Sequence, residues 1–311
     1  MSQKQIHLPV LLTAALDALS IRSAGIYIDA TFGRGGHSQA ILSRLGGQGR
    51  LLTIDKDESA IQVAKEKFAA DKRITAIHAS FARLQATAKS ENIMGKVDGI
   101  LFDLGVSSPQ LDDASRGFSF MHSGPLDMRM NQQQELTAAT WLAQASESEI
   151  AQILYRYGEE KFSRRIAKAI VNARQAQAII TTSQLAEIIK RAHPKWERHK
   201  HPATRSFQAI RIFINAELIE LKQALLQCLD VLKTGGRLVV ISFHSLEDRL
   251  VKQFIKQQQF GQPLPRHLPI EKKSQLPGLV SINKKVKPSS EEIAVNIRSR
   301  SAILRVAEKV S

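Results

Sequence analysis

The chain has 311 residues, of which 43% are hydrophobic and 23% charged, and this composition excludes a disordered chain, a coiled coil and a disulfide-stapled mini-protein. The single cysteine, Cys228, lies in an apolar helical pattern where we expect it only to pack, and its solitude suits a reducing cytoplasm. The N-terminus is polar and the apolar run 238–243 is too short to cross a membrane, so we expect no signal peptide and no membrane partner. The 44 basic and 29 acidic residues leave a net charge of +15, which is typical of proteins that bind a polyanion.

Short apolar runs in the first hundred residues predict four buried strands, at 25–31, 50–56, 74–79 and 97–104. The segments between them carry apolar residues at steps of three and four, which predicts helices at 37–45, 58–70 and 82–91. Strands and helices that alternate at these lengths form right-handed βαβ units. The fold class is therefore α/β with a parallel sheet.

The alternation stops at Ser107, and the next convincing strand is 237–244. Between them the pattern is helical only, so we interpret 126–202 as an inserted helical subdomain, which divides the main domain into a first part, 1–125, and a second part, 203–311.

The second part of the main domain begins with apolar residues at helical spacing over 203–232, which predicts one long helix closed by Gly235-Gly236. It should return the chain to the sheet. Beyond the 237–244 strand we expect a helix at 246–255, an irregular segment at 261–300 and a last strand at 302–306.

Basic residues concentrate between Lys161 and Arg211, where twelve Lys or Arg stand against two Glu. Such a local excess is the electrostatic footprint of a nucleic-acid-binding surface, although an acidic membrane or a merely solvated surface are the alternatives. Helical spacing puts four of these residues on one stripe, opposite an apolar face that includes Ile166 and Ile170. The predicted RNA-binding residues are this stripe and two later arginines: Lys161, Arg164, Arg165, Lys168, Arg205 and Arg211.

The run DATFGRGGH, residues 29–37, lies where the first strand gives way to a helix. Glycines there let the backbone approach a ligand, and the helix N-terminus offers free N–H groups, although a plain tight turn is an alternative. A dinucleotide fingerprint requires a third glycine where this chain has Ser38. Asp29 would repel a pyrophosphate but suits the cationic amino-acid part of S-adenosylmethionine, so Asp29 and Gly33 join the predicted cofactor site.

Three more polar residues follow predicted strands: Asp55, Asp103 and His244. Ligands of open parallel sheets bind outside the carboxyl ends of the strands, so these side chains should share one crevice with Asp29. Asp55 is placed to accept hydrogen bonds from ribose hydroxyls, which S-adenosylmethionine and a nicotinamide dinucleotide both carry. For Asp103 and His244 a structural role, such as capping a helix, is the alternative.

Several longer runs together resemble one known family: DATFGRGGHS, LFDLGVSSPQLDDASRGFSF, YGEEKFSRRIAKAI, HPATRSFQAIRIFINAEL and ISFHSLEDR. They are similar to the bacterial ribosomal RNA small-subunit methyltransferase H family over nearly the whole chain, most weakly at 261–290. The resemblance implies a Rossmann-like class I methyltransferase sheet, S-adenosylmethionine as the methyl donor, and methylation at N4 of a decoding-centre cytidine in the 16S ribosomal RNA of the small ribosomal subunit. It leaves a homodimer open.

The same resemblance implies cofactor contacts along the first four strands, at Gly35, Gly36, His37, Asp55, Phe81, Asp103 and Gln110. Asp103 is also the predicted catalytic residue, because a carboxylate can take the proton that the cytosine amine loses. Many amino-methyltransferases have Pro-Pro-aromatic after this residue, whereas this chain has Leu-Gly-Val. No metal is expected. A nicotinamide-dependent oxidoreductase and a non-catalytic RNA-binding assembly factor are the competing function classes.

Overall fold

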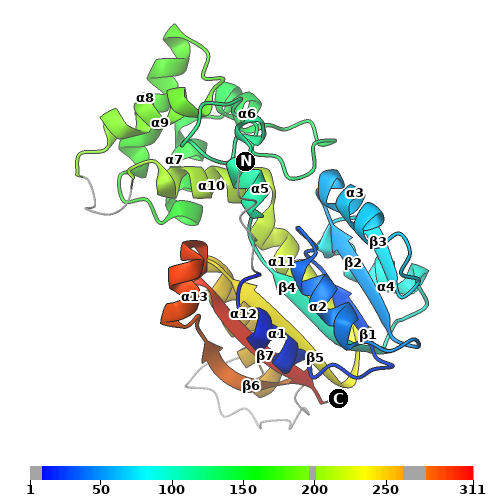
Figure 1. Ribbon diagram of the computed structural model, residues 1–311. Helices are drawn as coiled ribbons and strands as arrows, with labels where there is room; N and C mark the ends of the chain where they lie inside the picture. The colour runs from blue at the N-terminus through cyan, green and yellow to red at the C-terminus, as the bar shows by residue number, and fades with distance from the viewer. Residues whose placement is uncertain (1–8, 196–200, 262–277, 311) are drawn as a thin grey trace, which may run out of the picture. The chain divides into compact units, whose positions relative to one another are not determined.

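The computed structural model describes residues 9–195, 201–261 and 278–310 (Figure 1). The chain forms two compact units, one of residues 1–105 with 218–311 and the other of Val106–Glu217. The second unit is wider at both ends than the predicted insert, 126–202. Phe118 is buried in the helical core on one side of that range and Phe207 on the other, and both would be exposed if the unit were cut at the predicted boundaries.

The first unit contains a seven-stranded sheet of order β3-β2-β1-β4-β5-β7-β6. Five strands are parallel: β1 (Ile26–Asp29), β2 (Arg50–Asp55), β3 (Ile74–His78), β4 (Val97–Asp103) and β5 (Leu232–Ser242). The antiparallel strand β7 (Ile303–Lys309) lies between β5 and β6 (Leu279–Val286). This confirms the predicted α/β fold class with a Rossmann-like sheet.

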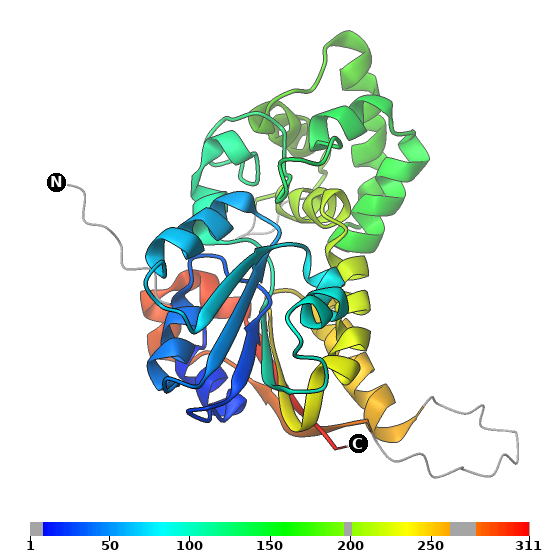
Figure 2. The ribbon, with the colours of Figure 1, turned by 90° about the vertical axis from the view of Figure 1, so that its right-hand side faces the viewer.

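Helices cover both faces of this sheet (Figure 2). Side chains alternate along β4, so that Ile100 and Phe102 enter one core while Leu101 enters the other. The first core is shared with α4 (Leu84–Ser90), α11 (Glu217–Val231) and α12 (Ser245–Phe260), and the second with α1 (Leu12–Leu19) and α2 (Gly36–Arg44). Burial on both faces is why β4 reads as a continuous apolar run. The remaining helical segments of the sheet unit are α3 (Glu58–Lys67), η1 (Phe81–Arg83), α13 (Ser290–Val295) and η3 (Ile297–Ser301).

The predicted single helix over 203–232 is wrong, because the chain forms α10 (Thr204–Ile214) and then α11. The break falls at Asn215 and Ala216, where Ala216 adopts a positive φ of 50°. The Asn215 amide is used elsewhere: Oδ1 accepts a hydrogen bond from the Met130 N–H at 2.7 Å, and Nδ2 donates to the Met128 carbonyl at 2.7 Å. Gly235 also does not end a helix, since it lies within β5.

The prediction of an irregular segment over 261–300 is wrong for its second half. That half contains β6, α13 and η3, while 262–277 lie outside the described residues. The β6 sequence LVSINKKV carries two lysines, and it forms the edge of the sheet, where charged residues are common. A strand of this kind lacks the apolar run that identified the central strands.

The second unit is built from helices: α5 (Ser108–Asp112), η2 (Ala114–Arg116), α6 (Ala138–Gln144), α7 (Glu147–Gly158), α8 (Ser163–Ala176), α9 (Thr182–Ala192) and α10. Ile166 and Ile170 of α8 are fully buried, as the predicted apolar face requires. Gly158 lets α7 approach α10 closely, since a Cβ there would lie 2.7 Å from the Arg205 carbonyl oxygen. Among the described residues no helix is long and apolar enough to cross a membrane.

Candidate cofactor site

The glycine loop connects β1 to α2. Gly33 and Gly35 adopt positive φ angles of 56° and 71°, a conformation that favours glycine. A Cβ on Gly36 would lie 2.3 Å from Cγ of Pro9, so this glycine is required by packing. The loop is thus shaped by its own backbone and its neighbours before any ligand binds.

Two predicted acids hold this loop in place. Asp29 is fully buried and accepts hydrogen bonds from the Ser38 hydroxyl at 2.6 Å and the Thr31 N–H at 3.2 Å. Asp55 Oδ2 accepts from the Gly33 N–H at 2.8 Å. Burial raises the pKa of Asp29 to about 7 and the pKa of Asp55 to about 6. Asp29 is therefore a buried residue that holds the loop through hydrogen bonds to Thr31 and Ser38.

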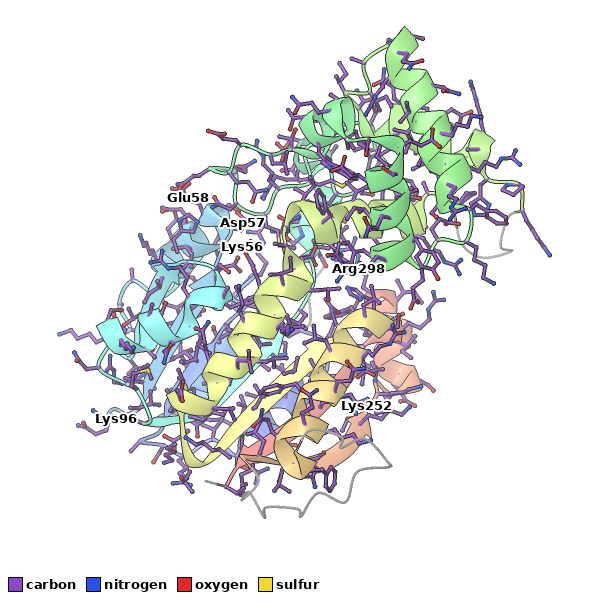
Figure 3. All side chains as sticks on the ribbon, turned by 180° about the vertical axis from the view of Figure 1, so that it is seen from behind. Lys56, Asp57, Glu58, Lys96, Lys252 and Arg298 are labelled. Carbon is purple, nitrogen blue, oxygen red and sulfur yellow. The ribbon has the colours of Figure 1, made fainter. Side chains whose placement is uncertain are left out.

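The end of β2 leads directly into α3, and Figure 3 labels Lys56, Asp57 and Glu58 at this junction. Asp57 caps α3 by accepting a hydrogen bond from the Ser59 N–H at 3.0 Å. Its own N–H donates to Asp55 Oδ1 at 2.9 Å. The Lys56 ammonium forms an ion pair with Glu220 at 2.7 Å. Asp57, the cap of α3, thus also holds the side chain of Asp55 at the end of β2.

Asp103, at the end of β4, is tied to the same loop. Its N–H donates to the Thr31 hydroxyl at 2.6 Å, and its Oδ2 lies 3.5 Å from His37 Nδ1. Its other oxygen, Oδ1, is enclosed and has no hydrogen-bond partner among the described residues. Burial raises the pKa of Asp103 well above its usual value, and the charges of Asp29 and Glu247 add to this effect.

His37 is a buried, neutral imidazole. Its Nε2 lies 3.2 Å from the Val10 carbonyl, which can only accept, so Nε2 carries the hydrogen and Nδ1 presents a lone pair to Asp103. Burial lowers the pKa of His37 to about 4. The contact with Asp103 is therefore satisfied when the Asp103 carboxyl is protonated and donates to Nδ1.

His244 has a structural position. It is the N-cap of α12, and its Nδ1 lies 3.4 Å from the Glu247 N–H that it accepts. Glu247 is 2% exposed and accepts hydrogen bonds from the N–H groups of Phe243 at 2.8 Å and His244 at 3.3 Å. Glu247, whose charge acts on Asp103, is not among the residues predicted from the sequence. The capping pattern His-Ser-Leu-Glu was the available signal.

The other two predicted contacts lie in different units. Phe81, in η1, is half-buried and packs edge-to-face on Phe102 with ring centroids 5.6 Å apart, which leaves an aromatic surface near the strand ends. Gln110, in the helical unit, is 8% exposed, and its Oε1 accepts a hydrogen bond from the Ser107 N–H at 2.9 Å. Within its own unit Gln110 thus caps α5.

The predicted RNA-binding residues differ in their surroundings. Those of the stripe, Lys161, Arg164, Arg165 and Lys168, are all exposed. Arg211 is only 14% exposed and forms a two-bond ion pair with Glu217, with Nε–Oε1 and Nη2–Oε2 distances of 2.8 Å. Arg205 is half-buried on α10. The stripe is therefore the part of the predicted set that is presented to solvent.

The charge balance of the site indicates the ligand it fits. No Lys or Arg forms an ion pair with Asp29, Asp55 or Asp103 in the part of the chain that the structure describes. Enclosed acids with raised pKa values gain stability from a positive charge, and they disfavour a phosphate. The charge of these acids therefore fits a cationic ligand better than the pyrophosphate of a dinucleotide.

Comparison with known proteins gives the family. The sequence pattern of the MraW methylase family matches residues 4–310, so the chain belongs to this family. It is 54% identical to "Ribosomal RNA small subunit methyltransferase H" of Legionella pneumophila strain Paris, over 98% of this chain and 99% of that protein. The protein of the same description from Pseudoalteromonas atlantica is 54% identical over the full length of both chains. Among solved structures, a putative rRNA-methylase from Clostridium thermocellum matches at 12% identity with a TM-score of 0.45, covering 98% of this chain and 99% of that one.

Proposed function

We propose that this protein is an S-adenosylmethionine-dependent methyltransferase that acts in the cytoplasm on N4 of cytidine C1402 in the decoding centre of 16S ribosomal RNA. The observation that carries the proposal is a set of acids with raised pKa values at the carboxyl edge of the sheet. Asp29 is buried, Asp55 and Asp103 are half-buried, and none of them forms an ion pair with a Lys or Arg among the described residues. The relatives from Legionella pneumophila and Pseudoalteromonas atlantica are described as small-subunit ribosomal RNA methyltransferases, which supports the proposal.

The residues present fit this cofactor. The unpaired Asp103 Oδ1 and the buried Asp29 supply negative charge, Asp55 offers further lone pairs for ribose hydroxyls, and the Phe81 ring offers a surface for adenine. The Gly35 and Gly36 backbone at the start of α2 completes the set. When bound, S-adenosylmethionine supplies an electrophilic methyl group.

The chain's own contribution to the reaction is positioning and proton transfer. The cytosine amine is a weak nucleophile, because its lone pair is delocalised into the ring. An ionised Asp103 accepts a hydrogen bond from the amine and takes its proton as the new C–N bond forms. The Asp103 N–H donates to the Thr31 hydroxyl, which fixes the backbone of this residue. The Nδ1 lone pair of His37 lies 3.5 Å from Asp103 Oδ2, where it accepts a hydrogen bond once the carboxyl has taken the proton.

The position of the one cysteine argues against methylation at C5 of the cytosine. Methylation at cytosine C5 ordinarily requires a thiolate that adds to C6. Cys228 is fully buried in α11, where burial raises the pKa of its thiol, and the sequence has no other cysteine. Attack by the N4 amine needs no such adduct.

The decisive experiment is transfer of labelled methyl from S-adenosylmethionine to small-subunit ribosomal RNA, followed by mass analysis of the nucleosides. N4-methylcytidine is the expected product. Label at C5, or no label with either free RNA or assembled subunits, would contradict the proposal. Tight binding of a nicotinamide dinucleotide would favour the oxidoreductase, and RNA binding without transfer would favour the assembly factor.

A further inference from the structure

We propose that a groove between α8 and α9 binds one nucleotide of the ribosomal RNA, with its phosphate on Arg165 and Lys168 and its base on the apolar floor. This inference rests on the proposed function for its ligand. The two helices pack side by side within the helical unit (Figure 1), and the groove has a volume of about 440 Å³. That volume falls in the range of roughly 300 to 1,000 Å³ found for small-molecule sites.

The charge of the groove matches an anion. Among the described residues its lining includes Arg165, Lys168 and Arg191 and no acid. Arg165 and Lys168 are exposed and form no ion pair or hydrogen bond within the described part of the chain, so their charges are available to a ligand. Arg191 is held at the rim through a 2.8 Å contact of its Nε with Glu187.

The floor of the groove matches a base. Ala169 and Ala173 of α8 and Ile188 of α9 are half-buried apolar residues, and the short side chains of the two alanines leave room for a flat group. Asn172 adds an amide, which can donate to and accept from the edge of a base. A simple anion would need only the cations, whereas a nucleotide uses the cations, the amide and the apolar surface together. An acidic peptide is the competing ligand.

The groove divides the basic stripe into two halves. Arg165 and Lys168 line it, whereas Lys161 and Arg164 of the same stripe do not. Charge alone predicts that removal of either pair weakens RNA binding equally, since both pairs are exposed. The groove predicts an unequal loss, and this inequality is what an experiment can measure.

The test compares two double variants with the same net charge, R165Q/K168Q and K161Q/R164Q, in binding isotherms with a 16S ribosomal RNA transcript at several salt concentrations. We expect the groove pair to lose about tenfold in affinity and about 0.7 units of log-log salt slope, the value for one single-strand phosphate contact. The outer pair should lose threefold or less. Equal losses in the two variants would overturn the groove but leave the proposed function intact, whereas absence of RNA binding by the unmodified protein would contradict the proposed function itself.

A second variant tests the floor without changing any charge. A169L places a larger side chain in the groove, so RNA affinity should fall at least threefold while the salt slope and the thermal unfolding midpoint stay unchanged. If A169L is less stable, N172A provides the same test of the base site through the amide. Unchanged affinity in a stably folded floor variant would contradict the base site. Loss of binding to assembled subunits but not to the transcript, in R165Q/K168Q, would assign the groove to an acidic protein segment and overturn the proposal.

Discussion

Asp55 links the glycine loop to the second strand through its hydrogen bond with Gly33, and it is also the proposed acceptor for ribose hydroxyls. Asp55→Ala should weaken S-adenosylmethionine binding by roughly 1.5 to 3 kcal/mol, the usual contribution of hydrogen bonds to a charged group. RNA affinity should barely change. Calorimetric titration measures the loss, with Glu66→Ala on the exposed side of α3 as the control. Unchanged cofactor affinity in Asp55→Ala would remove this residue from the site.

Asp103 has two proposed roles, which one substitution separates. Asp103→Asn keeps the size and polarity of the side chain but removes its charge, so the amine loses its proton acceptor. If Asp103 acts as the base, the single-turnover methylation rate should fall about 10²- to 10⁴-fold, the usual range for general base catalysis. Cofactor affinity, measured on the same preparation, should fall far less. Equal losses in both quantities would show that Asp103 only binds the cofactor.

The buried acids also predict a pH dependence of cofactor binding. With pKa values of about 7 for Asp29 and about 6 for Asp55, and a higher than usual pKa for Asp103, the free site holds protons at mildly acidic pH. A cationic ligand favours the ionised acids, so binding must release protons, and affinity should rise as pH increases from about 5 to about 7.

Calorimetry at pH 6 in buffers of different ionisation heat should show this release for S-adenosylmethionine. S-adenosylhomocysteine lacks the sulfonium charge and should release fewer protons, which makes it the matched control. Equal proton release with both ligands would contradict the electrostatic account of the site.

At the scale of elements, the strands and helices that could be predicted from the sequence are those whose apolar residues recur at regular spacing within the element itself. β4 is buried on both faces and α8 on one, and both patterns are visible in short windows. The helix break at Asn215 could not be predicted, because the backbone groups that bind its side-chain amide belong to Met128 and Met130, more than eighty residues away in sequence. The charged edge strand β6 was missed for a related reason: its identity depends on pairing with β7.

For the candidate site, the positions of the acids could be predicted from the sequence, but their partners and charge states could not. Asp29, Asp55 and Asp103 each lie at the end of a strand, and the apolar run of each strand locates that end in the sequence. Their partners do not, since the Val10 carbonyl that fixes the His37 tautomer lies 27 residues away and Glu247 lies on another strand-helix junction. Burial sets the charge state of the acids, and burial is a property of the folded chain.

The start of α2 provides a test at this scale. Gly36→Ala places a Cβ 2.3 Å from the Pro9 ring, so either the ring or the helix must move. The free energy of unfolding should fall by about 1 to 3 kcal/mol, the usual cost of overpacking. Pro9→Ala should recover much of this loss in the double variant, as denaturant unfolding would show. A double variant as unstable as the sum of the single variants would mean that Pro9 is not the obstacle.

At the scale of the molecule, the glycine loop with its acids and the exposed basic stripe lie in different units of a chain whose net charge is +15. The enclosed acids belong to the sheet unit, while the exposed stripe belongs to the helical unit. A solvated stripe that only keeps the protein soluble is the alternative to RNA binding. Salt dependence distinguishes the two, because each phosphate contact releases condensed counterions.

Replacement of Arg164, Arg165 and Lys168 with Gln should therefore weaken ribosomal RNA binding and flatten its log-log salt dependence by up to about two units, at about 0.7 per single-strand contact. S-adenosylmethionine affinity should stay the same, because the glycine loop and Asp55 lie in the other unit. Binding isotherms at several salt concentrations measure the slope, and cofactor calorimetry on the same triple variant is the control. An unaltered slope would show that the stripe does not contact RNA, and the search would move to the basic residues from 190 onwards, with Arg211 disfavoured by its ion pair with Glu217.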